Sequence, residues 1–142
     1  MVKTAAAAAF ALLLLVPGAA GEVGTGPPVF IKLRPDSQLT AVLRPSVSTD
    51  DPDRTYDATI RTYLKVGDHR IARLEQVAVH VTTTPIRVSI RVPKSARTAA
   101  AKRAARTHHR RVTVTFVVRA TETASGAVVG PYGIDTYLLL RH

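Results

Sequence analysis

The stretch RRVTVTFVVRATETASGAVVGPYGIDTYLLLR, residues 110–141, decides the fold. From Val112 to Ala120 an apolar residue occupies every second position, and the positions between are mostly threonine and arginine. Successive side chains of a β-strand point to opposite faces of the sheet, so this pattern predicts a strand with one face on a core. A turn at 122–126 and a second alternating run complete a hairpin, and Pro131 predicts a bulge because proline cannot donate to a strand ladder.

The same period of two recurs along most of the preceding chain. Strands are predicted at 29–34, 39–43, 58–66, 71–81 and 86–92. Turn-forming residues, among them glycine, proline and aspartate, separate these runs. With the closing hairpin the chain has about seven predicted strands at a spacing that is typical of an all-β Greek-key sandwich.

One segment departs from this period. Residues 93–107, PKSARTAAAKRAART, are rich in alanine, arginine and lysine, which favour a helix. Ser95 is its predicted N-cap residue. At 100° per residue, the alanines that gather on one side are Ala96, Ala100, Ala101, Ala104 and Ala105. We therefore expect a crossover helix that lies on the sandwich through small side chains and exposes Lys102, Arg103 and Arg106.

The first 21 residues predict a cleavable export signal. Lys3 and the amino terminus supply positive charge, and residues 5–16 are twelve uncharged apolar residues. At about 1.5 Å per residue, a helix of that length is too short for a hydrocarbon core of about 30 Å. A proline, a glycine and small residues follow, so cleavage is expected after Ala20 or Gly21. The alternatives are a buried helix and an uncleaved anchor.

The remainder of the chain predicts a flexible lead-in at 22–28 and one β-sandwich domain at 29–142. A domain of this size buries roughly two thirds of its unfolded surface, which is enough for a core without disulfides. The sequence contains no cysteine, and this excludes thiol catalysis and cysteine-ligated zinc. No other segment approaches 18 apolar residues, so no membrane span is expected in the mature chain. The expected location is secreted, periplasmic or otherwise outside the cytoplasm.

Positive charge is concentrated in the second half of the chain. Residues 22–75 contain eight basic and eight acidic residues, whereas residues 76–142 contain eleven basic and two acidic residues. Between 94 and 111 there are seven lysines and arginines and no acid. Such a tract favours a polyanion as partner, and outside the cytoplasm this means anionic lipid headgroups or wall polymers. Nucleic acid is not expected, because aromatic residues do not interleave with the basic ones.

The predicted ligand-binding residues are accordingly Lys102, Arg103, Arg106, Arg110 and Arg111. The competing interpretation is a solvated crossover whose charges keep the protein soluble.

No motif predicts catalysis, a metal or a cofactor. The sequence lacks G-x-S-x-G, a P-loop and a glycine-rich dinucleotide motif. None of the five histidines has metal-ligand spacing, and the pair His108-His109 lies among arginines, which repel cations. The aspartates of the 50–57 segment admit calcium binding, a small hydrolase site or plain turns. The absence of EF-hand spacing and the presence of Arg54 favour turns.

The closing hairpin at 110–141 resembles the last two strands of immunoglobulin-like and fibronectin-III-like domains. From Ile86 the order strand, basic alanine-rich crossover, strand, small turn and terminal strand is similar to the end of such domains in exported bacterial proteins. The match covers about residues 58–142. The chain lacks the cysteine pair and buried tryptophan of antibody domains, and it has Ser125-Gly126 where the bacterial turn often contains asparagine. The resemblance implies a role in adhesion, spacing or binding and carries no catalytic residue.

These observations predict an exported, non-enzymatic immunoglobulin-like sandwich that acts as a binding or structural module at the cell envelope. One alternative is polyanion binding through the basic helix at 94–111. The other is a small hydrolase that uses the Asp50–Asp57 loop. Expected partners are an anionic envelope polymer, lipid headgroups or another exported protein, and fold-level likeness alone chooses none of them.

Overall fold

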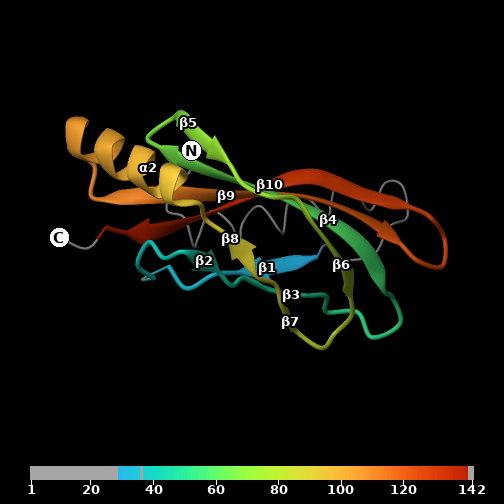
Figure 1. Ribbon diagram of the computed structural model, residues 1–142. Helices are drawn as coiled ribbons and strands as arrows, with labels where there is room; N and C mark the ends of the chain where they lie inside the picture. Colours follow the sequence, from blue (N-terminus) through green and yellow to red (C-terminus); the bar gives the residue numbers. More distant parts are fainter. Residues whose placement is uncertain (1–28, 36, 141–142) are drawn as a thin grey trace.

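The computed structural model describes residues 29–35 and 37–140, so the predicted signal segment and lead-in lie outside the described residues. Figure 1 shows a mostly β chain with a single helix in this part, as predicted. The elements are β1 (Phe30–Lys32), β2 (Val42–Leu43), β3 (Ser46–Ser48), β4 (Tyr56–Val66), β5 (His69–Arg73), β6 (Val77–Val81), β7 (Ile86–Arg87), β8 (Ile90–Arg91), α2 (Lys94–Arg106), β9 (Arg111–Glu122) and β10 (Val128–Leu139).

Strand β4 is the centre of a large antiparallel sheet. One of its edges pairs with β9, from Tyr56 opposite Glu122 to Lys65 opposite Thr113, and β9 pairs in turn with β10. The other edge pairs with β6 and then with β5. The alternating sequence of β4 buries every second residue from Tyr56 to Val66, as the period of two predicts.

The predicted bulge in the closing hairpin is confirmed. The register between β9 and β10 shifts between Val129 and Tyr132, where Gly130 and Pro131 interrupt the pairing. Proline has no amide hydrogen to donate, and Gly130 has a φ of 90°, which a residue with a side chain rarely adopts.

The second layer consists of the short strands β1, β2, β3, β7 and β8. The pair β2–β8 continues the register of the pair β3–β7. β3 pairs with β1 and β7, and β2 pairs with β8. Between these pairs the Val88 amide donates to the Pro45 carbonyl at 2.9 Å. Pro45 cannot return a hydrogen bond, so the ladder is interrupted there. Residues 41–48 and 86–92 therefore form one two-stranded ribbon that is split by a proline.

The structure divides the chain more finely than the seven predicted strands, and β3 lies outside the predicted runs. The ten strand segments of the described chain fall on seven stretches when β2 is grouped with β3, β5 with β6, and β7 with β8. β5 and β6 lie along the same edge of β4, and the Leu74 amide between them donates to the Thr62 carbonyl at 2.8 Å.

A single hydrophobic core combines the inward-facing side chains of both layers. Tyr56, Phe116 and Leu64 of the large sheet are fully buried in it, together with Val47 and Ile90 of the second layer. A polar contact crosses this core: the Tyr132 hydroxyl donates to the Val29 carbonyl at 2.6 Å. Burial raises the pKa of the Tyr132 phenol well above its ordinary value, so the hydroxyl keeps its proton.

The helix α2 connects β8 to β9 and contacts β4, β5 and β9. Two details of the prediction were wrong. The helix begins after Pro93, whose carbonyl accepts the Arg97 amide at 3.0 Å, and Ser95 lies inside the first turn and makes no capping bond. Of the predicted alanine face only Ala96, Ala100 and Ala104 are buried. A spacing of four keeps these residues on one narrow stripe, whereas Ala101 and Ala105 lie 100° further round and are exposed.

This packing predicts a large effect of substitution at Ala100 and a small one at its neighbour Ala101. Ala100 is 0% exposed, so a leucine in its place has no room. We expect Ala100→Leu to lower the free energy of unfolding by roughly 1–3 kcal/mol. The exposed Ala101→Leu should change it by less than about 0.5 kcal/mol. Urea unfolding followed by circular dichroism measures both, and equal stability of the two variants would contradict a close contact between α2 and the sheet.

Candidate functional site

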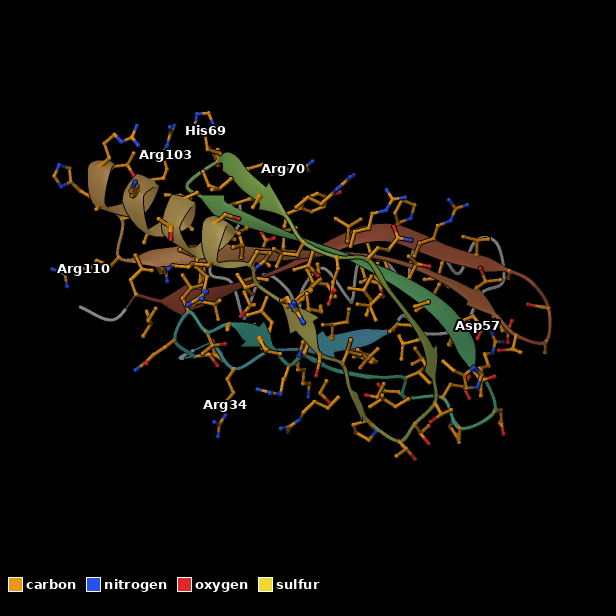
Figure 2. The ribbon with its side chains drawn as sticks, viewed as in Figure 1. Arg34, Asp57, His69, Arg70, Arg103 and Arg110 are labelled. Carbon is orange, nitrogen blue, oxygen red and sulfur yellow. The ribbon has the colours of Figure 1, made fainter. Side chains whose placement is uncertain are left out.

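The five predicted ligand-binding residues lie at one end of the sandwich. We call this part of the molecule the basic end. Lys102, Arg103 and Arg106 belong to the second half of α2, Arg110 to the following loop, and Arg111 to the start of β9. Figure 2 shows Arg103 and Arg110 at the end of the molecule that is remote from Asp57. All five are exposed except Arg103, which is half-buried.

Local contacts stabilise the backbone of the basic end. The Arg103 carbonyl accepts both the amide and the hydroxyl of Thr107, at 3.0 and 2.7 Å. Arg103 and Arg106 occupy the last turn of α2, where cations interact favourably with the helix dipole. The Arg111 guanidinium lies 3.8 Å from the centre of the Tyr137 ring. Arg111 therefore also has a structural role, since it covers an aromatic ring on the outer face of the large sheet.

The structure adds residues to this end that the sequence analysis missed. His69 and Arg70 of β5 lie at the same end as Arg103 (Figure 2), and the Arg70 guanidinium stacks on the Tyr63 ring at 3.8 Å. A Cβ atom at Gly67, in the turn before β5, would be 3.3 Å from His109 Nε2. Only the pairing of β4 with β9 brings this turn next to the loop after α2, so no linear pattern reveals it.

The charges of the basic end are not neutralised within the described chain. Of the lysines and arginines that the structure describes, only Arg54 forms an ion pair. The cations of the basic end are therefore available to an anionic partner.

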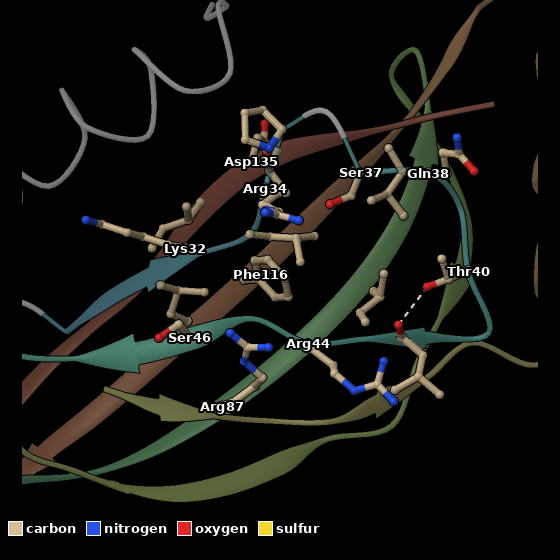
Figure 3. Close-up of a pocket in the computed structure, with 18 residues that line it drawn as sticks. Lys32, Arg34, Ser37, Gln38, Thr40, Arg44, Ser46, Arg87, Phe116 and Asp135 are labelled. Atoms are coloured by element: carbon tan, nitrogen blue, oxygen red, sulfur yellow. Dashed lines mark hydrogen bonds between the residues drawn. The ribbon is translucent and has the colours of Figure 1, made fainter. Parts of the chain in front are cut away.

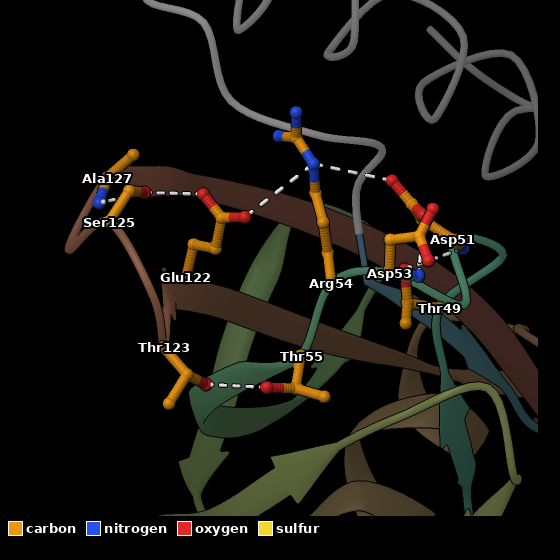
Figure 4. Close-up of polar contacts among 9 residues, drawn as sticks. All are labelled: Thr49, Asp51, Asp53, Arg54, Thr55, Glu122, Thr123, Ser125 and Ala127. Carbon is orange, nitrogen blue, oxygen red and sulfur yellow. Dashed lines mark hydrogen bonds and ion pairs between the residues drawn. The ribbon is translucent and has the colours of Figure 1, made fainter.

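The acidic segment is held as a structural turn. Arg54 Nε lies 3.3 Å from Asp51 Oδ2 and 3.6 Å from Glu122 Oε2 (Figure 4). Asp51 Oδ1 also accepts the Asp53 amide at 2.9 Å. Among the residues described, no three histidine, aspartate or glutamate side chains are placed to hold a metal ion. The acidic loop predicted at Asp50–Asp57 ends before Asp57, which belongs to β4. Asp57 Oδ1 lies 3.0 Å from His80 Nδ1.

This turn is joined to the hairpin between β9 and β10. The Thr55 hydroxyl donates to Thr123 Oγ1 at 2.8 Å, and Ser125 donates its hydroxyl to Glu122 (Figure 4). Tyr56 lies buried beside Arg54, and this burial raises the pKa of its phenol although the guanidinium opposes the shift. These contacts give Asp51 and Glu122 a structural role, and we call the arrangement of Arg54 with these two carboxylates the clamp.

A groove of about 980 Å³ opens in the second layer (Figure 3). β1 ends at Lys32 and the chain loops away before β2, whose described partner is β8 alone. Four cationic side chains surround the opening: Lys32, Arg34, Arg44 and Arg87. Its floor consists of core residues, among them Phe116, which is seen at the centre of Figure 3. No pattern in the sequence reveals this groove, because its residues come from separate elements.

Comparison with known proteins gives the fold only. No protein-family model matches the chain, and no curated protein sequence matches it. A crystal structure of a protein from Archaeoglobus fulgidus has 14% sequence identity and a TM-score of 0.46, over 81% of this chain and 95% of that chain. A solution structure of a protein from Arabidopsis thaliana has 10% identity and a TM-score of 0.50, over 81% of this chain and 80% of that chain. In the described part of this chain, no helix has the length and apolar character needed to cross a membrane.

The clamp around Arg54 predicts a loss of stability. In Arg54→Gln, Glu122 is left without its cation although its side chain is only 10% exposed. We expect the free energy of unfolding to fall by roughly 1–3 kcal/mol. The double variant Arg54→Gln/Glu122→Gln should recover part of this loss, because no buried charge remains unpaired. Chemical denaturation measures the cycle, with the exposed Arg119→Gln as control; a loss no larger than in that control would contradict the clamp.

Proposed function

We propose that this chain is an exported, non-enzymatic module with an immunoglobulin-like β-sandwich, and that it binds anionic components of the cell envelope through the basic end. One observation carries the proposal. Five cations from α2, the following loop and β9 converge at one end of the sandwich, and none of them pairs with a carboxylate in the described chain. Charges that are not neutralised internally attract polyanions over about 8 Å at physiological ionic strength.

The distribution of charge along the molecule supports an oriented contact. The acidic turn with Asp50, Asp51 and Asp53 belongs to the end where β4 starts, whereas the basic end lies where β9 starts. These two positions are opposite ends of the same antiparallel strand pair. The resulting dipole would turn the basic end toward an anionic surface and the acidic turn away from it.

The sandwich part of the proposal is supported by the two antiparallel layers over one core and by the seven stretches of strand. The closing hairpin resembles domains of exported bacterial proteins, and this resemblance supports export and a binding role. The predicted signal segment supports the envelope as the location.

Removal of the five charges tests the binding proposal. Each cation near an anionic membrane surface contributes about 1 kcal/mol, so replacing Lys102, Arg103, Arg106, Arg110 and Arg111 with glutamine should weaken binding by at least about tenfold. The measurement is co-sedimentation with vesicles of phosphatidylcholine and phosphatidylglycerol, at low and high salt. Vesicles of phosphatidylcholine alone should recover little protein.

A second variant tests whether binding depends on the position of the cations or only on the net charge of the protein. Glutamine at Arg61, Arg73, Arg91 and Arg119 removes four charges, one fewer than the first variant, from outside the basic end. This variant should retain most of the binding. Equal losses in both variants would show that only net charge matters, and unchanged binding in the first would remove the proposed role of the basic end.

Export predicts a defined mature terminus. When the full chain is expressed in a bacterial host, mass spectrometry of the extracytoplasmic protein should find Gly21 or Glu22 as the first residue. A charge in the apolar segment, as in Leu13→Arg, should leave an uncleaved chain inside the cell. An intact amino terminus on the membrane fraction of the unmodified protein would indicate an anchor instead.

A further inference from the structure

The rim of the groove arranges four cations around one opening. Strand pairing places Lys32 opposite Ser46 and Ser46 opposite Arg87, so the two cations flank the serine across three neighbouring strands. Adjacent strands are about 4.8 Å apart, which separates the outer two backbones by about 10 Å. Arg44 lies two residues from Ser46, and Arg34 lies two residues from Lys32. All four cations are exposed.

Cations outnumber carboxylates among the lining residues that the structure describes. Asp135 is the one carboxylate among the described lining residues, and its Oδ1 accepts the Thr115 hydroxyl at 2.7 Å. Guanidinium groups present planar pairs of donors that match the oxygens of a phosphate or carboxylate. The rim is thus suited to an anionic group.

The wall below the rim is apolar. Leu43, Phe116 and Ile134 form part of the floor and are at most 2% exposed, so they shape the groove but offer little free surface. Leu33 and Val42 also line it and are only half-buried. The aliphatic stems of the arginine and lysine side chains extend this apolar wall. Ligand pockets of about 300–1,000 Å³ commonly combine such an apolar lining with a few polar groups that orient the ligand.

We propose that this groove is a second binding site, separate from the basic end, and that it takes an anionic amphiphile with a single hydrocarbon chain. The phosphate or carboxylate head contacts the arginines of the rim, and the chain lies along Leu33 and Val42. A small hydrophilic anion leaves the apolar wall uncovered, and a neutral amphiphile leaves the rim charges without a partner. Only a ligand with both parts complements the groove.

A tryptophan in the groove provides a direct readout. The chain contains no tryptophan, so the fluorescence of Leu33→Trp reports on the groove alone. Titration with dodecyl phosphate below its micelle concentration should shift the emission to shorter wavelength and should saturate. Thr121→Trp, on the outer face of β9 at the end remote from the basic end, should show no shift. Calorimetric titration of the unmodified protein repeats the measurement without a change in the groove.

Changes in the hydrocarbon chain and in the head group of the probe test the apolar wall and the cationic rim separately. Each methylene that is buried should tighten binding by up to about fourfold, so affinity should rise from octyl to decyl to dodecyl phosphate. Inorganic phosphate and dodecyl glucoside should bind at least about tenfold more weakly than dodecyl phosphate. Equal binding of inorganic phosphate, equal binding of the glucoside, or affinity independent of chain length would each overturn the proposal.

Matched substitutions locate the site. Arg44→Gln/Arg87→Gln should weaken dodecyl phosphate binding by at least about tenfold, because it removes two charged hydrogen-bond donors from the rim. Arg61→Gln/Arg119→Gln removes the same charge from the large sheet and should have less than about a twofold effect. Equal losses in the two pairs, or no detectable binding to the unmodified protein, would overturn the proposal. The five-residue basic-end variant should bind dodecyl phosphate normally, so the two proposals can fail separately.

Discussion

The pairing of β4 with β9 is the constraint on which the rest of the structure depends. Ten residue pairs join these strands, from Tyr56 and Glu122 at one end to Lys65 and Thr113 at the other. Their inward-facing residues form one side of the core, which the second layer and α2 cover. β10 extends the sheet from β9, and β5 and β6 extend it from β4, so every large element of the domain is placed by this pair.

The same pair separates the charges of the molecule. Where β4 begins and β9 ends, Arg54 bridges Asp51 and Glu122 and neutralises part of an acidic turn. Where β4 ends and β9 begins, the turn at Gly67 meets the loop after α2, and no carboxylate of the described chain pairs with the arginines there. The antiparallel pair of β4 and β9 therefore separates two ends of the molecule. At one end carboxylates pair with Arg54, and at the other end the cations have no carboxylate partner in the described chain. That difference, more than the total charge, is why the basic end is the better candidate for binding.

The groove and the basic end present positive charge in different ways. On the basic end the cations project from a helix and a loop toward solvent, which suits an extended anionic surface. In the groove, Lys32 and Arg87 lie on the two outer strands of the β1-β3-β7 sheet, and apolar side chains line the wall below them. The shape of the groove restricts what can fill it, whereas the basic end restricts mainly the sign of the partner's charge.

The sequence alone determined the β-rich class, the position of the strands at 58–66 and 111–121, the bulge at Pro131 and the crossover helix, because each follows from the local period of apolar residues or from the missing proline amide. It could not identify Ala101 and Ala105 as exposed, since that depends on the narrow contact between α2 and the sheet. Tertiary structure alone decided that Asp57 leaves the acidic loop for β4, that Arg54 reaches Glu122, and that Arg44 and Arg87 share one groove. These residues are far apart in the chain, and only strand pairing across the sandwich brings their side chains together.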